Sequence, residues 1–350
     1  MNNFNIQNLI RENIKNMQPY SSARDEFKDF NKEMIFLDAN ENPNENGVNR
    51  YPDPQQKTVK LALSEIKRVP ENKILLGNGS DEVLDLLFRA FCEPNRDNVI
   101  TLPPTYGMYG VLANLNAIEN REVLLNENFE PQIDKILASV DQNTKMIFLC
   151  SPNNPTGNSF SDESIVTLLK NFNGIVVLDE AYIDFSAKES WLSEISDYPN
   201  LVITQTLSKA YGMAGIRLGI LYGSVEIITV LNKIKPPYNV NVLTQSKALQ
   251  YIESQETVKN QVEEIKNQRN LIYGELLNTN IVKEIYRTDA NFILCKVDDA
   301  NKRYNQLLEK GIVIRNRTND ALCENCLRIT IGTEVENQKF ISVLKVLDKS

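Results

Sequence analysis

Three short apolar runs, each closed by polar residues, most constrain the fold of this 350-residue chain. The runs are Lys145–Cys150, Ile175–Leu178 and Leu201–Thr204. Their length and composition predict buried strands, which are typical of mostly parallel sheets covered by helices. Open α/β sheets bind their ligands at the carboxyl ends of the strands. The polar residues that follow each run are therefore the candidate site residues.

The third run leads into the segment Thr206–Gly219, with the sequence TLSKAYGMAGIRLG. Ser208 and Lys209 fall at the carboxyl end of the predicted strand, and an amine held there can form a Schiff base with an aldehyde. Arg217 can reach an anion from the same loop, and the glycines let the backbone pass close to it. Taken alone, these residues are better explained as a loop lysine and a structural arginine than as a ligand-binding site.

The other two runs lead into residues that fit the same site. Ser151–Gly157, with the sequence SPNNPTG, is a stiff turn in which two prolines fix φ, and a plain tight turn is its alternative. Asp179 opens the sequence DEAY, which ends at Tyr182, and its alternative is a helix cap or turn residue. With SPNNPTG, DEAY and TLSKA in this order, the chain resembles the fold-type I aminotransferases that depend on pyridoxal phosphate (PLP), from about Tyr20 to Thr333.

Further motifs narrow the resemblance to the histidinol-phosphate aminotransferase family, within the class II aminotransferases. Pro104–Tyr109 (PTYGMY) and Cys326–Thr333 (CLRITIGT) are specific to that subgroup. The other shared motifs are Pro19–Tyr20, Asp38–Pro43, Arg50–Pro52, Gly77–Glu82 and Pro237–Asn241. The resemblance implies an α/β fold in which a large domain has a mostly parallel central sheet flanked by helices, beside a smaller α+β domain.

The implied activity is the reversible transfer of an amino group between L-histidinol phosphate and 2-oxoglutarate in L-histidine biosynthesis, which gives imidazole acetol phosphate and L-glutamate. Two other enzymes remain open: an aromatic or other amino-acid aminotransferase, and a PLP-dependent decarboxylase of the phosphothreonine type. A PLP-binding regulator without turnover is a third alternative. It is disfavoured because only a short arm precedes Asp38 and the chain is acidic.

The resemblance also implies roles for individual residues. Lys209 would hold PLP and move the proton, Asp179 would keep the pyridine nitrogen protonated, and Tyr182 would bond to the phenolic oxygen, so these three form the predicted catalytic set. The predicted cofactor-binding residues are Tyr51, Ser80, Asp81, Tyr106, Asn154, Asp179, Tyr182, Ser208, Lys209 and Arg217. The predicted substrate-binding residues are Tyr20, Asn154, Tyr238, Arg315 and Arg328. Tyr51 and Tyr238 would come from the neighbouring subunit of a homodimer.

Physical arguments support part of this set and leave alternatives for the rest. Gly77–Asp81 precedes a predicted helix, whose first N–H groups and dipole favour a phosphate. Ser80 as a helix cap is compatible with that interpretation. Tyr106 could instead be an ordinary core aromatic residue, and Arg315 and Arg328 could be surface arginines.

Composition excludes several other classes of protein. The formal net charge of −8 argues against nucleic acid or an anionic membrane as a partner. Because the chain has no histidine, Ser-His-Asp and Cys-His mechanisms are excluded, and proton transfer falls to lysine, tyrosine or carboxylates. Cys323 and Cys326 form a lone C-x-x-C without two further zinc ligands, so no metal site is predicted. With no membrane-length apolar run and a polar amino terminus, we expect a soluble cytoplasmic protein.

The expected domain organisation is interleaved. Residues 30–255 would form the large PLP-binding domain, and residues 1–29 and 256–350 the N-terminal arm and the small domain. The stretch 244–277 has no proline or glycine before Gly274, which predicts one long helix linking the two domains. The predicted strands of the small domain are Phe292–Cys295, Ile312–Ile314 and Leu327–Ile331.

Overall fold

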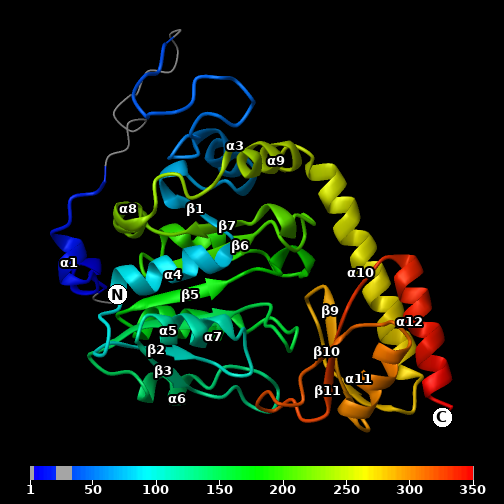
Figure 1. Cartoon of the computed structure of the whole chain (residues 1–350). Coiled ribbons are helices and arrows are strands. Elements are labelled where there is room, and N and C mark those ends of the chain that lie inside the picture. Colours follow the sequence, from blue (N-terminus) through cyan, green and yellow to red (C-terminus); the bar gives the residue numbers. More distant parts are fainter. Residues whose placement is uncertain (1–3, 21–33, 350) are drawn as a thin grey trace.

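The computed structural model describes residues 4–20 and 34–349. Its larger sheet has seven strands in the order β1-β7-β6-β5-β4-β2-β3 (Figure 1). Neighbouring strands run parallel except for β7, which is antiparallel to both β1 and β6. The strands are β1 (Ile74–Asn78), β2 (Asn98–Thr101), β3 (Glu119–Glu122), β4 (Thr144–Cys150), β5 (Ile175–Asp179), β6 (Leu201–Thr206) and β7 (Leu218–Tyr222). The prediction of a mostly parallel central sheet is confirmed.

Helices cover both faces of this sheet, which explains its unbroken apolar runs. In β5, Val176 and Leu178 belong to one hydrophobic cluster, whereas Ile175 and Val177 belong to a second. Alternate residues of a strand point to opposite faces, so the two clusters lie on the two sides of the sheet. The first cluster includes α3 (Lys57–Lys67), α6 (Ile133–Ala138), α7 (Asp162–Asn171) and α9 (Val242–Ile252). The second includes α1 (Glu12–Lys15), α4 (Ser80–Phe91), α5 (Met108–Leu115) and α8 (Val225–Ile234).

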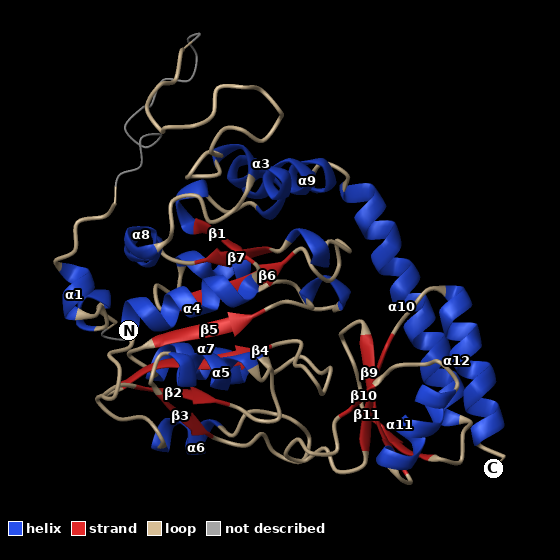
Figure 2. Ribbon diagram, in the orientation of Figure 1, coloured by secondary structure: helices blue, strands red, loops and turns tan. Residues whose placement is uncertain are grey.

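A smaller antiparallel sheet with its own core follows in the sequence (Figure 2). Its order is β10-β11-β9-β8, and the strands are β8 (Val282–Ile285), β9 (Phe292–Val297), β10 (Arg315–Asn316) and β11 (Cys326–Thr330). A third hydrophobic cluster joins this sheet to α11 (Ala300–Glu309), α12 (Glu334–Leu347) and the end of α10 (Gln255–Leu277). Short 3-10 helices lie at Ile6–Asn8, Glu71–Lys73, Ile183–Phe185, Trp191–Ser196 and Ala214–Ile216.

The prediction of one unbroken helix over residues 244–277 is wrong. The structure has two helices there, α9 and α10, separated at Glu253 and Ser254. Ser254 turns its side chain back onto the preceding helix, where its hydroxyl donates to Gln250 O at 2.9 Å. Serine competes for backbone groups in this way and favours helix ends. The longer helix, α10, spans from the large-sheet layer to the small sheet, because Val258 and Val262 pack in the first cluster and Ile272 and Leu276 in the third.

The predicted strand Ile312–Ile314 is also displaced. Ile312 N donates to Leu307 O at 2.9 Å, which closes the turn after α11, and Val313 is exposed. The strand β10 begins only at Arg315, whose register partner on β11 is Arg328. The displacement places two arginines side by side at the edge of the small sheet.

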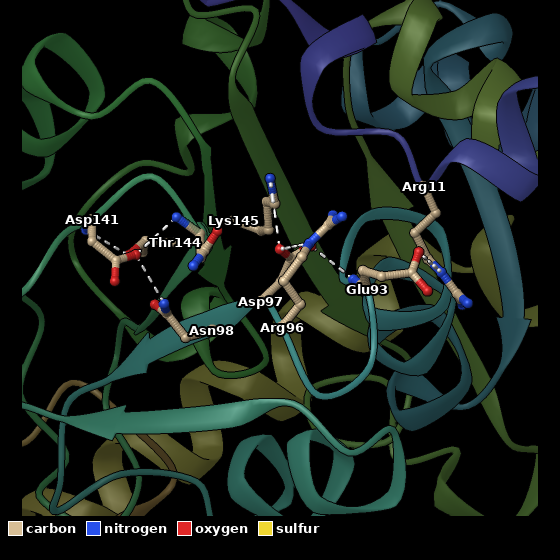
Figure 3. Close-up of polar contacts among 9 residues, drawn as sticks. Arg11, Glu93, Arg96, Asp97, Asn98, Asp141, Thr144 and Lys145 are labelled. Atoms are coloured by element: carbon tan, nitrogen blue, oxygen red, sulfur yellow. Dashed lines mark hydrogen bonds and ion pairs between the residues drawn. The ribbon is translucent and has the colours of Figure 1, made fainter.

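A polar cluster ties the described N-terminal residues to the amino end of the large sheet (Figure 3). The Arg11 Nε lies 3.3 Å from Glu93 Oε2, and Glu93 N donates to Asp97 Oδ2 at 2.8 Å. Asp97 is buried at the start of β2 and also pairs with Arg96 at 2.9 Å and Lys145 at 3.9 Å. These charges lie at the end of the sheet opposite to the predicted site, so their role is structural.

Candidate active site

The carboxyl ends of β4, β5 and β6 converge on a cavity of about 130 Å³. Cys150, Asp179 and Thr206, the last residues of those strands, line it, and the first turn of α4 closes one side. Of the ten predicted cofactor-binding residues, the nine that line this cavity are Ser80, Asp81, Tyr106, Asn154, Asp179, Tyr182, Ser208, Lys209 and Arg217. The sequence motifs that are far apart along the chain therefore meet at one edge of the sheet.

Lys209 follows β6 and reaches into the cavity. Its Nζ lies 5.6 Å from the centroid of the Tyr182 ring. The cavity leaves the side chain open to solvent, yet the surrounding protein lowers the pKa of its ammonium, chiefly through lost hydration and next through repulsion by Arg328. A lowered pKa increases the neutral fraction of the amine, which is the nucleophilic form.

Asp179 is buried at the end of β5, with 3 % of its surface exposed. The hydroxyl of Tyr109 donates to Oδ2 at 2.7 Å, and Ala181 N donates to Oδ1 at 3.2 Å. Burial raises the pKa of the Asp179 carboxyl, whereas the bond from Tyr109 opposes that rise. The bond from Ala181 N is the local contact expected if Asp179 were only a turn residue. It occupies only one of the two carboxylate oxygens.

Backbone groups and Arg217 shape the predicted phosphate site. Gly79, with φ of 84°, precedes α4, so Ser80 is the first helical residue and not its cap. The Arg217 guanidinium fills the place where a Cβ of residue 79 would lie. Its Nη2 lies 3.5 Å from Asp81 Oδ2, and Tyr106 Oη donates to Asp81 Oδ1 at 3.0 Å. A helix amino terminus beside a guanidinium is a site for an anion.

The small sheet supplies Arg328 to the same cavity region. Arg328 Nη1 donates to Asn154 Oδ1, and its guanidinium carbon lies 5.2 Å from the centroid of the Phe292 ring. Burial lowers the pKa of Arg328, with the charge of Arg315 among the smaller causes. Arg315 is exposed and does not line the cavity, but it is paired in register with Arg328. The two predicted substrate arginines are thus neighbours.

Besides the two arginines, three more of the predicted residues do not line the cavity of their own chain. Tyr51 and Tyr238 stack on each other with ring centroids 4.4 Å apart, and neither lines the cavity. Tyr20 is 75 % exposed. Conversely, Tyr109 and Thr206 take part in the contacts of the site but were not predicted from the sequence. Thr206 accepts a bond from Ser208 N at 3.1 Å, and its place in the TLSK motif was the available signal.

Two negative findings concern residues 4–20 and 34–349. No three or more cysteine or acidic side chains of this part are grouped to hold a metal ion. None of its helices has both the length and the apolar composition to cross a membrane.

Comparisons with known proteins identify the family. The model of the class I and II aminotransferases matches residues 20–344. The histidinol-phosphate aminotransferase of Flavobacterium psychrophilum is 69 % identical over 347 residues, which cover 99 % of this chain and 100 % of that protein. The solved structure of the enzyme of that name from Clostridium acetobutylicum is 25 % identical, with a TM-score of 0.80 over 86 % of this chain and 91 % of that one. The enzyme from Sinorhizobium meliloti, solved with pyridoxal-5'-phosphate, shares the fold, with a TM-score of 0.78 and 22 % identity over 86 % of this chain and 83 % of that one. The chain therefore belongs to the histidinol-phosphate aminotransferase family of PLP-dependent aminotransferases.

Proposed function

We propose that this chain catalyses the reversible transfer of an amino group between L-histidinol phosphate and 2-oxoglutarate, which gives imidazole acetol phosphate and L-glutamate. The names of its relatives support this reaction. The observation that carries the proposal is the pairing of Arg315 with Arg328 in register on β10 and β11. Two adjacent guanidinium groups beside the lysine-containing cavity suit a substrate that carries a phosphate.

The residues of the cavity fit PLP. Arg217, Ser80 and Ser208 would hold its phosphate at the amino terminus of α4, where the Gly79 backbone leaves room for the guanidinium. Asp179 would face the ring nitrogen and Tyr106 the ring. Asn154 and Tyr182 would bond to the phenolic oxygen. When bound, the cofactor supplies an electron sink for the charge that develops at the carbon bearing the amino group.

The chain's own residues would supply the remaining chemistry. Lys209 would hold the cofactor's aldehyde, and its free amine would then carry the proton, since lost hydration and the charge of Arg328 already lower its pKa. Asp179 would keep a negative charge at the base of the site, where Tyr109 and the Ala181 amide bind its oxygens. Arg328 would bind the substrate anion and orient the amide of Asn154 through their hydrogen bond.

The substrate anion would be bound mainly by charge. The ion pairs among the described residues include none to Arg315 or Arg328, so both cations are available to an anion. Each charge-assisted bond contributes roughly 1.5–3 kcal/mol. Glutamate would use the same two arginines through its carboxylates, which would let one pocket serve both half-reactions.

A substrate panel with 2-oxoglutarate tests the proposal, with Arg315→Ala as the variant. We expect wild type to prefer histidinol phosphate over phenylalanine, tyrosine and aspartate. Arg315→Ala should lower kcat/KM for histidinol phosphate by about 10- to 100-fold and should change that for phenylalanine much less. The control is Arg287→Ala, which removes another exposed arginine of the small-sheet region. Wild-type preference for an aromatic amino acid, or equal losses for both substrates, would refute the phosphate pocket, and release of CO₂ without 2-oxoglutarate would indicate a decarboxylase.

We also propose that the active form is a homodimer with shared sites. Tyr51 does not line the cavity of its own chain, and the segment that carries it extends away from the large sheet (Figure 1). Ile35 and Leu37, on the same segment, are each 88 % exposed, which leaves apolar surface for a second copy to cover. Sedimentation of the holoenzyme measures the oligomeric state, and a fully active monomer would contradict this part of the proposal.

A further inference from the structure

Tyr109 is a buried residue of α5 that contacts the deepest acidic group of the site. Its surface is fully buried, and its hydroxyl donates to Asp179 Oδ2 at 2.7 Å. The ring stacks on Phe148 with centroids 5.0 Å apart, and it meets Tyr106 edge-on at 5.6 Å. These two ring contacts hold the Tyr109 side chain in place, so the bond to Asp179 does not depend on a mobile side chain.

We propose that Tyr109 is a positioning residue that orients the Asp179 carboxylate and keeps it ionised against the ring nitrogen of the cofactor. The inference rests on the assignment of PLP to the cavity and does not depend on which amino donor the enzyme uses. Tyr109 does not itself line that cavity, so it acts through Asp179.

Two hydrogen bonds fix the orientation of the Asp179 carboxylate. A carboxylate rotates about its bond to Cβ unless both oxygens are held. In Asp179, Ala181 N binds Oδ1 at 3.2 Å and Tyr109 binds Oδ2 at 2.7 Å. The amide is fixed by the backbone, whereas the Tyr109 bond is shorter and comes from helix α5, which packs on the face of the sheet to which Asp179 turns. Loss of Tyr109 would therefore free one oxygen and allow the carboxylate plane to turn.

The Tyr109 bond also affects the charge of the Asp179 carboxyl. Asp179 lies in an almost dry environment, and burial raises the pKa of its carboxyl while the Tyr109 bond opposes that rise. Its cross-strand neighbours are Cys150, whose thiol pKa is raised by burial, and Thr204, so neither adds a cation. Thr204 also lowers the pKa of Asp179, whereas the charge of Asp81 raises it. Without the hydroxyl, the pKa of the Asp179 carboxyl would rise further. A neutral acid is a poor ionic partner for a protonated ring nitrogen.

Tyr109→Phe tests the proposal, with Tyr222→Phe as a matched control. Both residues are fully buried, but Tyr222 Oη has no hydrogen-bond partner among the described residues. Each variant removes one buried oxygen, and only Tyr109→Phe removes a bond to Asp179. The readouts are the pH midpoint of the visible absorption of the bound cofactor, the PLP dissociation constant, and kcat/KM. Urea unfolding of both apoproteins reports any loss of folding.

In Tyr109→Phe we expect the absorption midpoint to rise, because a less firmly protonated ring nitrogen withdraws less charge from the nitrogen that joins Lys209 to the cofactor. We also expect kcat/KM to fall about 10- to 100-fold, the value of one hydrogen bond to a charged group. Tyr222→Phe should leave both unchanged. In an Asp179→Asn background, the same Tyr109→Phe change should cost less than about twofold, because coupled residues are not additive.

Two outcomes would overturn the proposal. One is an absorption midpoint and a PLP dissociation constant in Tyr109→Phe that equal those of Tyr222→Phe. The other is a full, additive loss from Tyr109→Phe in the Asp179→Asn background. If Tyr109→Phe does not fold, 3-fluorotyrosine at position 109 provides a second test. It is a stronger donor of nearly the same shape, and it should move the midpoint in the opposite direction, so an unchanged midpoint would refute the positioning role.

Discussion

Replacing Gly219 by alanine measures how closely strand β7 supports the proposed phosphate site. A Cβ added at Gly219 would lie 2.5 Å from Gly79 O and closer still to Gly79 C and Ser80 N, all of which are backbone atoms. Ordinary contact begins at 3.4 Å, so the turn before α4 must move by at least 3.4 − 2.5 = 0.9 Å. Overpacking of this kind costs roughly 1–3 kcal/mol of folding free energy. A displacement of about 1 Å at a positioned group costs on the order of 100-fold in function.

We therefore expect Gly219→Ala to raise the PLP dissociation constant by about 10- to 100-fold and to lower the urea midpoint of the apoprotein. The control is Gly215→Ala in the 3-10 helix that precedes β7, because no atom lies within 4 Å of a Cβ built there. Fluorescence titration with PLP gives the affinity of each variant, and urea unfolding gives its stability. Wild-type PLP affinity in Gly219→Ala would refute the reasoning, and so would an equal loss in Gly215→Ala.

Two further predictions concern lysines. Borohydride treatment of the holoenzyme should fix the cofactor on Lys209, and Lys209→Ala should abolish transamination; peptide mapping that finds the label on another lysine would contradict the assignment. The second is Lys60, where burial and then repulsion by Lys235 lower the pKa from 10.5 to about 8. Below pH 8 Lys60 is charged in both the folded and the unfolded state, and its burial lowers the free energy of unfolding by on the order of 3 kcal/mol. This loss of stability decreases as the pH rises from 8 to 10.5. Lys60→Met should therefore stabilise the apoprotein in urea at pH 7 and much less at pH 10, and an equal gain at both would exclude the charge as the cause.

The fold could be predicted where one local pattern decides it. Unbroken apolar runs such as Ile175–Leu178 require burial on both faces, and that environment occurs in a parallel sheet between two helical layers. The cavity could be predicted for the same reason. Residues that follow the strands of a parallel sheet must meet at one edge, so Asp179 and Lys209 were expected to lie together without knowledge of the strand order.

The helix boundary could not be predicted from the absence of glycine and proline. Residues 244–277 have the composition of a helix throughout, but the chain must pass from the large-sheet layer to the small sheet within that stretch. The break falls at Ser254, whose hydroxyl replaces an intrahelical contact. Tertiary packing therefore determined where the helix breaks. Gly274, by contrast, lies inside α10, where an added Cβ would meet nothing within 4 Å.

The pairings that tune the site depended on strand order and register, which no single segment of the sequence contains. Tyr109 and Asp179 are 70 residues apart, and they meet because α5 packs on the same face of the sheet to which the Asp179 side chain turns. Arg315 and Arg328 are close in sequence, yet only the register of β10 with β11 makes them direct neighbours. A sequence motif can therefore indicate which side chains take part in the chemistry. The order and register of the strands determine which neighbouring side chain contacts each of them. For this reason the residues that line the cavity were easier to predict than Tyr109, which lies one layer behind them.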